Sequence, residues 1–189
     1  MRIIGGKFKG QVINFLKTKN TRPLKDSVKE NLFNILTHSS DIKIEIKNSK
    51  ILDLYSGIGS FGLECLSREA KIVSFVEFDS EAIKILKENL LKLSLHKQSE
   101  IIINKVENIE NWEKKYDIFF FDPPFKDSKF VENLKNLKNK EIYKKNHLVI
   151  IHREKNSKDN LSDILEILKI KIYGRSKIIF ASFKKVNSL

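Results

Sequence analysis

The sequence predicts an α/β protein with a doubly wound, mostly parallel sheet of seven strands that ends in an antiparallel hairpin. From Lys50 onward, short apolar segments alternate with segments of helical periodicity, as in a parallel sheet with crossover helices. A glycine-rich segment, residues 57–62, joins the first of these strands to the first helix. The last two strand-like segments meet at Gly174, where no crossover helix fits, so they must pair antiparallel. The predicted fold is therefore Rossmann-like.

The composition is that of one soluble globular unit with a strong basic excess. The 189 residues suffice for one core and a small extension, and the net charge of +12 favours an anionic partner such as nucleic acid. A nucleotide bias in the source genome that enriches Lys and Asn would produce the same excess. Cys65 is the only cysteine and the four histidines lack ligand spacing, so neither a disulfide nor a metal site is expected. Without a signal-peptide core or an apolar run of ~18 residues, we expect a cytoplasmic protein away from membranes.

The first 40 residues are predicted to form a small extension that begins with a β-hairpin. Residues 2–16 contain two strand-like segments with glycines at the bends, and Lys7 and Lys9 flank Phe8 at the turn. Basic residues around an aromatic ring suit contact with nucleic acid, and a solvated hairpin tip is the equal alternative.

A helix is predicted to complete this extension. It follows Arg22 and takes a polar cap from residues 26–27, and its apolar stripe leaves Arg22 and Lys29 on or near the outer side. Residues 37–49 have no clear period and are expected to be a linker, with a short strand at residues 42–46 as an option.

The main domain is predicted to span residues 50–189. Its expected strands are residues 51–54, 71–78, 101–104, 117–121 and 147–151 and the two halves of the terminal hairpin at 170–183. The first expected helix has Phe61, Leu63, Cys65 and Leu66 on or near its inner face and ends near residues 68–69. The other expected helices cover residues 80–93, 128–139 and 161–168.

The glycine loop indicates a nucleotide-type ligand. Residues 57–62 read G-x-G-x-x-G between a strand and a helix, and Glu77 ends the next strand. This pattern fits a dinucleotide pyrophosphate with Glu77 on the ribose, so a nicotinamide or flavin oxidoreductase is one alternative. Asp53, in the first strand, disfavours a pyrophosphate and suits a ligand with an ammonium or sulfonium group.

The sequence Asp122-Pro123-Pro124-Phe125 lies at the end of the fourth strand. The prolines cannot donate to the sheet, so they end the strand and place Asp122 at the carboxyl edge, where α/β sheets bind ligands. A carboxylate, fixed backbone carbonyls and an aromatic ring together can hold a planar base through its exocyclic amine. A strand end with a turn and an exposed Phe is the alternative.

These two motifs together predict S-adenosylmethionine as the cofactor. Its amino-acid end would lie on the glycine loop near Asp53, its ribose on Glu77, and its adenine by Asn104 and Lys105. Phe78 would pack on the adenine or, equally, in the core. The predicted cofactor-binding residues are Asp53, Tyr55, Gly57, Gly59, Glu77, Phe78, Asn104 and Lys105.

At these residues the chain resembles the RsmD family of bacterial 16S ribosomal RNA guanine-N2 methyltransferases. The resemblance covers nearly the whole chain, and its motifs are residues 2–10, 22–34, 53–68, 75–77 and 122–125. The chain departs from the family pattern at Leu24, Ser27 and Lys29, where Thr, Arg and Arg are usual, and at Glu69, where Gly is common. Lys cannot copy the bidentate fork of an Arg, so these departures concern RNA contact.

The resemblance implies methyl transfer from S-adenosylmethionine to N2 of a guanine in 16S ribosomal RNA, free or in the 30S subunit or an assembly intermediate. Catalysis would fall to Asp122, Pro123, Pro124 and Phe125, and RNA contact to Arg2, Lys7, Lys9, Arg22 and Lys29. We expect a monomer. The alternatives are a related amino methyltransferase acting on transfer RNA guanine or DNA adenine, and a non-catalytic RNA-binding protein.

Overall fold

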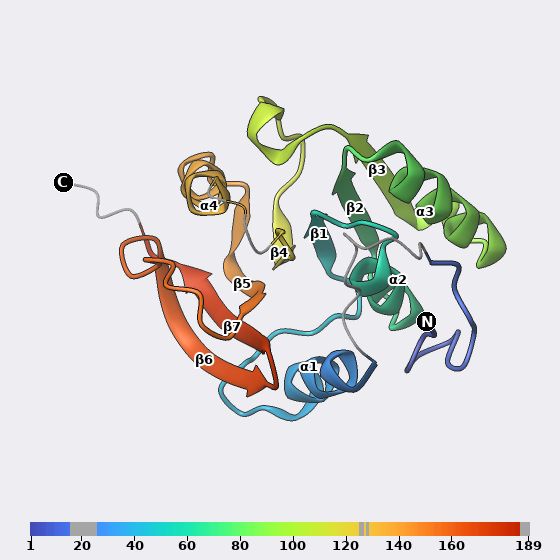
Figure 1. Cartoon of the computed structure of the whole chain (residues 1–189), viewed down its shortest axis with the longest axis horizontal. Coiled ribbons are helices and arrows are strands. Elements are labelled where there is room, and N and C mark those ends of the chain that lie inside the picture. The colour runs from blue at the N-terminus through green and yellow to red at the C-terminus, as the bar shows by residue number, and fades with distance from the viewer. Residues whose placement is uncertain (16–25, 125–126, 128, 186–189) are drawn as a thin grey trace.

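A seven-stranded sheet forms the centre of the computed structural model, which describes residues 1–15, 26–124, 127 and 129–185. Its strands are β1 (Lys50–Leu54), β2 (Ile72–Glu77), β3 (Ser99–Ile103), β4 (Tyr116–Phe121), β5 (Tyr143–Glu154), β6 (Leu165–Tyr173) and β7 (Ser176–Phe183). Their order is β3-β2-β1-β4-β5-β7-β6 (Figure 1). The pairs among β1 to β5 are parallel, whereas β7 is antiparallel to β5 and β6. The predicted mixed sheet with its terminal hairpin is confirmed.

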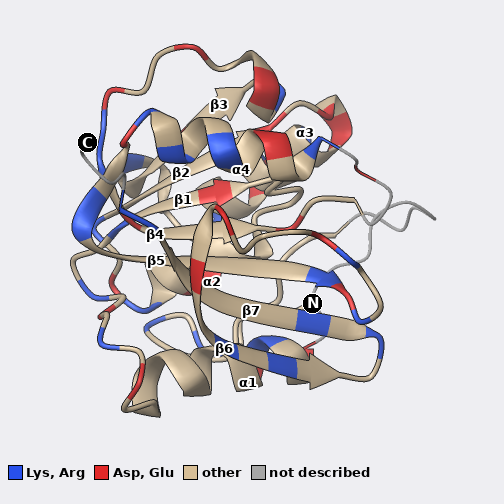
Figure 2. Ribbon diagram, turned by 90° about the vertical axis from the view of Figure 1, so that its left-hand side faces the viewer, with Lys and Arg blue, Asp and Glu red and all other residues tan. Residues whose placement is uncertain are grey.

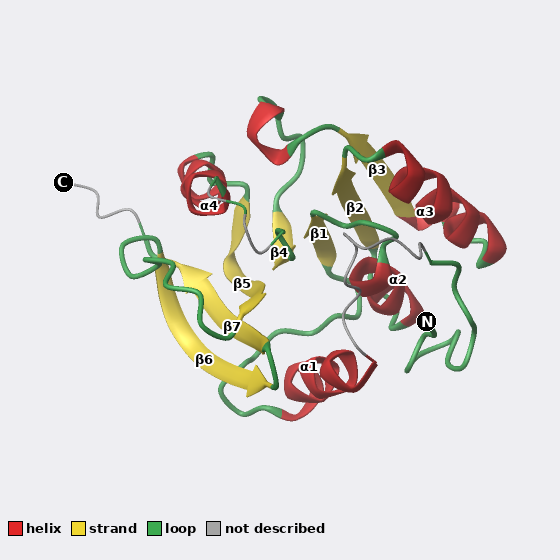
Figure 3. Ribbon diagram, viewed as in Figure 1, coloured by secondary structure: helices red, strands yellow, loops and turns green. Residues whose placement is uncertain are grey.

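Helices cover both faces of the sheet unequally. They are α1 (Asp26–His38), α2 (Ser60–Ser67), α3 (Ser80–Lys92) and α4 (Phe130–Asn139), with 3-10 turns η1 (His96–Gln98) and η2 (Val106–Asn108). Helices α1, α2 and α3 share one core with the first face, and α4 packs on the other (Figure 3). In β4, Phe120 faces the first core, and Phe119 and Phe121 face the second. Burial on both faces explains why this strand is continuously apolar.

The prediction of a helix at residues 161–168 is wrong. A turn occupies residues 162–164, and β6 begins at Leu165 and pairs with β7 along its length. Leu161, Ile164 and Leu165 are buried, as the helical spacing required, but a turn leading into a strand buries the same three side chains. The β-branched residues that follow favour the strand.

The optional strand at residues 42–46 is also absent, since no strand is assigned there. The segment instead crosses the surface in an irregular conformation, with Ile42 and Ile46 buried in the first core and Ile44 partly buried against it.

The predicted N-terminal hairpin is reduced to a single bridge between Arg2 and Val12. Three backbone bonds join the two segments, from Ile3 N to Gln11 O at 2.9 Å, from Ile13 N to Met1 O at 3.0 Å and from Gly10 N to Ile3 O at 2.8 Å. Ile3 and Ile13 are buried in the core that α1, α2 and α3 share. Packing on the main body therefore holds this segment, and the short ladder contributes little.

The last turn of α2 binds the N-terminal segment through polar contacts. Lys7 N donates to Ser67 O at 2.8 Å, Phe8 N donates to Ser67 Oγ at 3.0 Å, and Ile4 N donates to Glu64 Oε2 at 2.8 Å. At Gly6, where φ is 74°, an added Cβ would lie 2.0 Å from Ser67 O, so only glycine fits. The segment is thus fixed at one end of α2.

Lys29 is buried, against the prediction that it lies on the outer side of α1. Its side chain is 0% exposed, and Nζ donates to Arg2 O at 2.7 Å and lies 3.9 Å from Glu64 Oε2. Burial lowers the pKa of Lys29, and the Glu64 charge opposes this shift. Lys29 occupies the same helical phase as Leu32, Phe33 and Leu36, which places it within the apolar stripe.

Candidate active site

The carboxyl ends of β1 to β4 surround a cavity of about 210 Å³. The predicted cofactor residues Tyr55, Glu77, Phe78, Asn104 and Lys105 line it, together with Pro124 of the proline motif. These residues come from four separate segments, and the parallel sheet brings them to one edge. Val76, Val106, Glu107 and Asp127 complete the lining.

Glu77 organises the backbone around this cavity. Its Oε2 accepts from Gly57 N at 2.7 Å, and its Oε1 accepts from Phe78 N at 2.8 Å and Asp79 N at 2.9 Å. A carboxylate has about four acceptor positions, so these three bonds leave capacity for a ligand hydroxyl. Glu77 is therefore held in one orientation at the position predicted to bind the ribose.

Asp53 supports the glycine loop from behind. It is 1% exposed, it is not among the residues that line the cavity, and its Oδ2 accepts from Gly62 N at 3.0 Å. Burial raises the pKa of Asp53 well above its usual range. The charges of Asp122 and Glu77 add to this shift, and the Gly62 bond opposes it. The first turn of α2 is thus fixed to β1 by a carboxylate that is costly to ionise.

The two loop glycines predicted to bind the cofactor have different structural roles. Gly57 has φ of 53°, and a Cβ there would meet nothing within 4 Å, so the backbone stays open to close approach by a ligand. Gly59 has φ of 81°, and a Cβ would lie 2.5 Å from Leu86 Cδ1. Gly59 is therefore required for the packing of the loop against α3.

Two aromatic residues border the cavity. Tyr55 has φ of 58°, an uncommon value that marks functional sites, and its hydroxyl accepts from Asn133 Nδ2 at 2.9 Å. Burial raises the pKa of Tyr55. Phe78 is 58% exposed, and Lys105 Nζ lies 5.3 Å from its ring centroid. The core alternative for Phe78 is therefore wrong, and its ring is available for stacking.

The proline motif is held by residues that sequence reasoning placed only vaguely or missed. Asp122 Oδ1 lies 2.7 Å from His152 Nδ1, and His152 Nε2 lies 2.9 Å from Ser176 Oγ. The strand predicted at residues 147–151 implies that His152 lies at its end near the ligand edge, and nothing in the sequence indicated Ser176. Pro123 is buried and Pro124 exposed. Phe125 lies outside the described residues.

Arg153 fixes the far side of the same turn. Its Nη1 donates to Pro124 O at 3.2 Å, and its Nε and Nη2 bind the two oxygens of Asp159 at 2.9 Å and 3.0 Å. The guanidinium carbon lies 4.6 Å from the Phe130 ring centroid. The Arg153 side chain is therefore locked, and so is the carbonyl that it contacts.

The predicted RNA-binding residues do not gather at the cavity. Arg2, Lys7 and Lys9 are exposed on the N-terminal segment, where Arg2 pairs with Asp26 at 3.6 Å and Lys7 with Glu69 at 3.3 Å. Arg22 lies outside the described residues, and the burial of Lys29 removes it as a surface contact. In Figure 2, positions of Lys and Arg occur on α4, β6 and β7.

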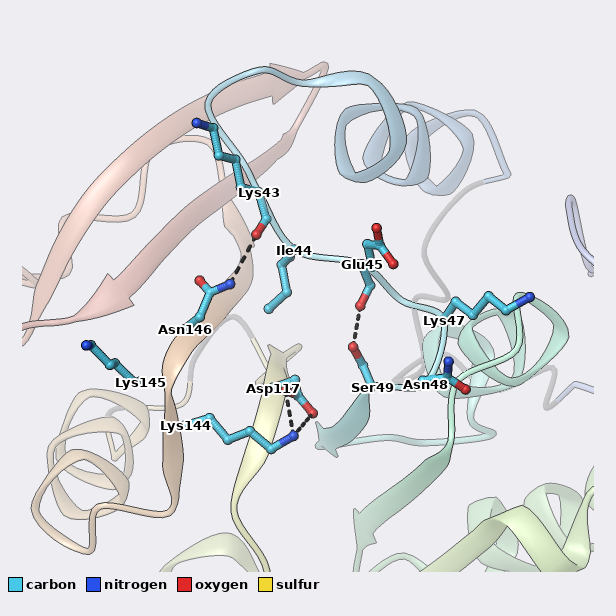
Figure 4. Close-up of a pocket in the computed structure, with 10 residues that line it drawn as sticks. All are labelled: Lys43, Ile44, Glu45, Lys47, Asn48, Ser49, Asp117, Lys144, Lys145 and Asn146. Atoms are coloured by element: carbon cyan, nitrogen blue, oxygen red, sulfur yellow. Dashed lines mark hydrogen bonds and ion pairs between the residues drawn. The ribbon is translucent and has the colours of Figure 1, made fainter.

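A larger cavity, of about 580 Å³, lies at the opposite edge of the sheet (Figure 4). It is lined by Lys43, Ile44, Glu45, Lys47, Asn48, Ser49, Asp117, Lys144, Lys145 and Asn146. Asp117 is occupied by Lys50 N at 2.8 Å and Lys144 Nζ at 2.8 Å, and the lysines point in different directions. None of the predicted site residues lines this cavity.

The described part of the chain contains no group of three or more His, Cys, Asp or Glu side chains placed to hold a metal ion. In that same part, no helix has the length and apolar character needed to cross a bilayer.

The sheet order and the acidic carboxyl edge define the fold class of the class I methyltransferases. One solved structure, yhhF from Escherichia coli, is named as a methyltransferase; it superposes with a TM-score of 0.82 at 25% identity, covering 97% of this chain and 98% of that one. A second, from Haemophilus influenzae and named as a methylase, has a TM-score of 0.73 at 30% identity, covering 95% and 96%.

The chain belongs to the family whose model is described as Conserved hypothetical protein 95, which matches residues 1–182. Relatives named ribosomal RNA small subunit methyltransferase D confirm the resemblance seen in the sequence. The one from Buchnera aphidicola subsp. Baizongia pistaciae is 36% identical over 154 residues, covering 82% of this chain and 76% of the relative. The one from Haemophilus influenzae is 32% identical over 179 residues, covering 92% and 89%.

Proposed function

We propose that this protein transfers a methyl group from S-adenosylmethionine to N2 of a guanine in 16S ribosomal RNA of the small subunit. The observation that carries this proposal is the cavity at the carboxyl edge. There Tyr55, Glu77, Phe78, Asn104 and Lys105 converge next to the turn that holds Asp122. Relatives that carry ribosomal RNA methyltransferase names support the choice of acceptor.

The residues present fit the proposed cofactor. Glu77 retains acceptor capacity for ribose hydroxyls, and the exposed Phe78 ring offers a stacking face for adenine. The charges of Glu77 and Asp122 at this edge favour a cationic ligand. When bound, S-adenosylmethionine supplies an electrophilic methyl on a positively charged sulfur that leaves as a neutral thioether.

The same geometry disfavours a dinucleotide pyrophosphate. Such a ligand needs free N–H groups on the glycine loop. Here Gly57 N donates to Glu77, Gly62 N donates to Asp53, and Gly59 N donates to Ser56 O at 2.8 Å. The loop amides are engaged, and two of their partners are carboxylates, so an oxidoreductase is the weaker candidate.

Asp122 and the prolines would orient the acceptor amine. The lone pair of the guanine exocyclic amine is delocalised into the ring, so the amine is a poor nucleophile. Hydrogen bonds from the amine to Asp122 and to the Pro123 carbonyl would localise that lone pair toward the methyl group. The acceleration would come from in-line positioning and charge complementarity. Phe125 would stack on the base, with about 1–3 kcal/mol from such stacking.

The exposed N-terminal residues Arg2, Lys7 and Lys9 would contact the RNA backbone, and Arg22 remains a sequence-based prediction for the same role. These contacts make affinity fall as salt rises, because phosphate binding releases counterions. The guanine must leave its stack to reach Asp122, so an exposed or loop nucleotide is the expected target.

The test is methyl transfer from tritiated S-adenosylmethionine to 30S particles from cells lacking the enzyme, to free ribosomal RNA and to transfer RNA. Wild type runs beside Asp122→Ala and beside Asp117→Ala, a carboxylate at the opposite edge of the sheet. We expect label in N2-methylguanine of the small-subunit RNA with wild type and Asp117→Ala, and none with Asp122→Ala. Label on transfer RNA alone would overturn the acceptor. No label together with no cofactor binding by calorimetry would overturn the cofactor.

A further inference from the structure

The end of β5 reaches the proline turn with two consecutive side chains. His152 is 4% exposed and contacts Asp122, whereas Arg153 contacts the Pro124 carbonyl. Successive residues of a strand point to opposite faces, so β5 holds the turn from both sides of the sheet. The Asp122 side chain itself is 26% exposed, as a group that must meet a substrate requires.

Two hydrogen-bond contacts of His152 indicate which ring nitrogen carries a hydrogen. An ionised Asp122 only accepts hydrogen bonds, so His152 Nδ1 must carry the hydrogen that points to Asp122 Oδ1. In a neutral imidazole the other nitrogen is then an acceptor, and the Ser176 hydroxyl donates to Nε2. Ser176, His152 and Asp122 thus form a chain of hydrogen bonds that ends on one oxygen of the carboxylate.

The terminal hairpin supplies the outer member of this chain. Ser176 is the first residue of β7, and the antiparallel register pairs it with Glu154, while His152 pairs with Ile178. The insertion of β7 beside β5 therefore brings a hydroxyl to within 2.9 Å of the imidazole. A helix or a parallel strand in this place would not present the same residue.

We propose that His152, oriented by Ser176, is a positioning residue that fixes the Asp122 carboxylate so that its second oxygen faces the substrate amine. This inference rests on the proposed methyl transfer. With Oδ1 bound to His152, Oδ2 is the oxygen left for the amine. A carboxylate that rotates freely would present its lone pairs in many directions, and catalysis by positioning is sensitive to shifts of about 1 Å. His152 does not touch the reacting atoms.

Two near-isosteric variants test separately the contact of His152 with Asp122 and its contact with Ser176. In His152→Asn, the side-chain amide nitrogen can occupy the place of Nδ1 and still donate to Asp122. In His152→Gln, the amide can reach the place of Nε2 near Ser176 but puts no donor at the Nδ1 position. We expect His152→Asn to keep kcat within about 5-fold of wild type, and His152→Gln and His152→Leu to lower it roughly 10- to 100-fold. KM for the cofactor should stay unchanged in all three.

The matched control is His147, which lies on the same strand and is hydrogen-bonded at both nitrogens. Its Nδ1 lies 2.7 Å from Lys144 O, and its Nε2 accepts from Phe183 N at 2.9 Å. His147→Leu should lower the unfolding midpoint and leave kcat of the folded protein unchanged. Ser176→Ala should lower kcat less than His152→Gln, because only the orientation of the imidazole is relaxed.

The outcomes distinguish the positioning role from the proposed function. Methyl transfer is measured on 30S particles under saturating cofactor, with cofactor binding and thermal unfolding followed for every variant. Loss of kcat in His152→Gln with recovery in His152→Asn, at equal cofactor affinity, supports the inference. Full activity in His152→Gln, or equal loss in His152→Asn and His152→Leu, overturns it. An inactive wild type that still binds cofactor would overturn the acceptor assignment.

Discussion

The two edges of the sheet hold two cavities of opposite character. At the amino edge, the cavity of about 580 Å³ is lined by lysines, and its one strand carboxylate, Asp117, is bound by a backbone N–H and by Lys144. At the carboxyl edge, the cavity of about 210 Å³ is lined by groups that other residues hold in fixed orientations. The larger cavity thus has lysines at its rim that point in different directions, and the smaller one is lined by side chains that neighbouring residues orient. Orientation of side chains, more than volume, marks the site that can do chemistry.

A buried ion pair and an exposed ion pair at the amino edge should differ most in their contribution to the free energy of unfolding. Lys29 and Glu64 are both 0% exposed, whereas Lys144 and Asp117 at the amino edge are 43% and 16% exposed. Lys29→Ala removes a fully buried side chain and leaves the Arg2 carbonyl without its donor, although Glu64 keeps Arg68 at 2.9 Å, so the substitution should cost about 3 kcal/mol of unfolding free energy. Lys144→Ala should cost less than about 1 kcal/mol. Urea unfolding measures both, and equal costs would break the comparison.

Glu77 lies at the carboxyl edge of the sheet and Asp117 at the amino edge, so substitutions of these two carboxylates compare the edges directly. Glu77→Gln puts an amide where an oxygen now accepts backbone N–H groups, and it removes the charge proposed to face the ribose. We expect S-adenosylmethionine to bind roughly 100-fold more weakly, since bonds to a charged group contribute about 1.5–3 kcal/mol each. Asp117→Asn should leave the affinity unchanged. Calorimetry decides, and a similar loss in both variants would contradict the assignment of the edges.

The substitution Asp53→Asn should show how a buried acid at the carboxyl edge changes the free energy of unfolding with pH. The folded pKa of Asp53 is raised well above 3.8 by burial, so the folded state binds a proton more tightly than the unfolded state. Its contribution to stability therefore falls as pH rises from about 4 through the raised pKa. Asp53→Asn can still accept from Gly62, and its stability should gain on wild type as pH rises. Unfolding at pH 5 and pH 8 measures this, and a constant difference would refute it.

The same variant should bind S-adenosylmethionine more weakly, if the Asp53 charge faces the positive end of the cofactor as the sequence predicts. A gain in stability with a loss in affinity is the trade-off expected at a functional site. Unchanged affinity would assign Asp53 a purely structural role at the glycine loop. Calorimetry at pH 7.5 is the measurement, with Asp117→Asn as the control at the opposite edge.

Substitutions of Glu69 should change the stability of the protein least. Glu69 has φ of 67°, a conformation that favours glycine, and its exposed side chain pairs with Lys7 at 3.3 Å and Lys47 at 3.0 Å. Hydrogen bonds from Lys47 and Lys7 lower the pKa of Glu69 below 4.5, so these pairs stabilise near neutral pH and are lost as pH falls through the folded pKa.

Two substitutions separate the backbone of Glu69 from its charge. Glu69→Gln loses the ion pairs and keeps the backbone conformation, so it should have the lowest melting temperature at pH 7. Glu69→Gly loses the same pairs and relieves the backbone, so it should gain on wild type as pH falls below 4. Melting curves at pH 7 and pH 3.5 check both statements, and a Gln variant more stable than the Gly variant would contradict them.

The parallel strands and the cavity they form could be predicted because both depend on local signals. An apolar run followed by the glycine loop identifies β1, an apolar run ended by prolines identifies β4, and the parallel arrangement places Glu77 and Asp122 at one edge. The helix predicted at residues 161–168 was wrong because a turn followed by a strand buries the same side chains as a helix. The role of Ser176 could not be predicted for a different reason. The contact of Ser176 with His152 depends on the register between β5 and β7, which no local pattern records.

Helix α2 has a consequence for how this chain can change in length. Its first turn is tied to β1 through Gly62 and Asp53, and its last turn holds Ile4 and Lys7 through Glu64 and Ser67. One inserted or deleted residue would turn everything beyond it by about 100° and shift it by about 1.5 Å. Neither end could then keep its partners. The eight residues of α2 therefore act as a spacer of fixed length, and loops must absorb the insertions that this helix cannot.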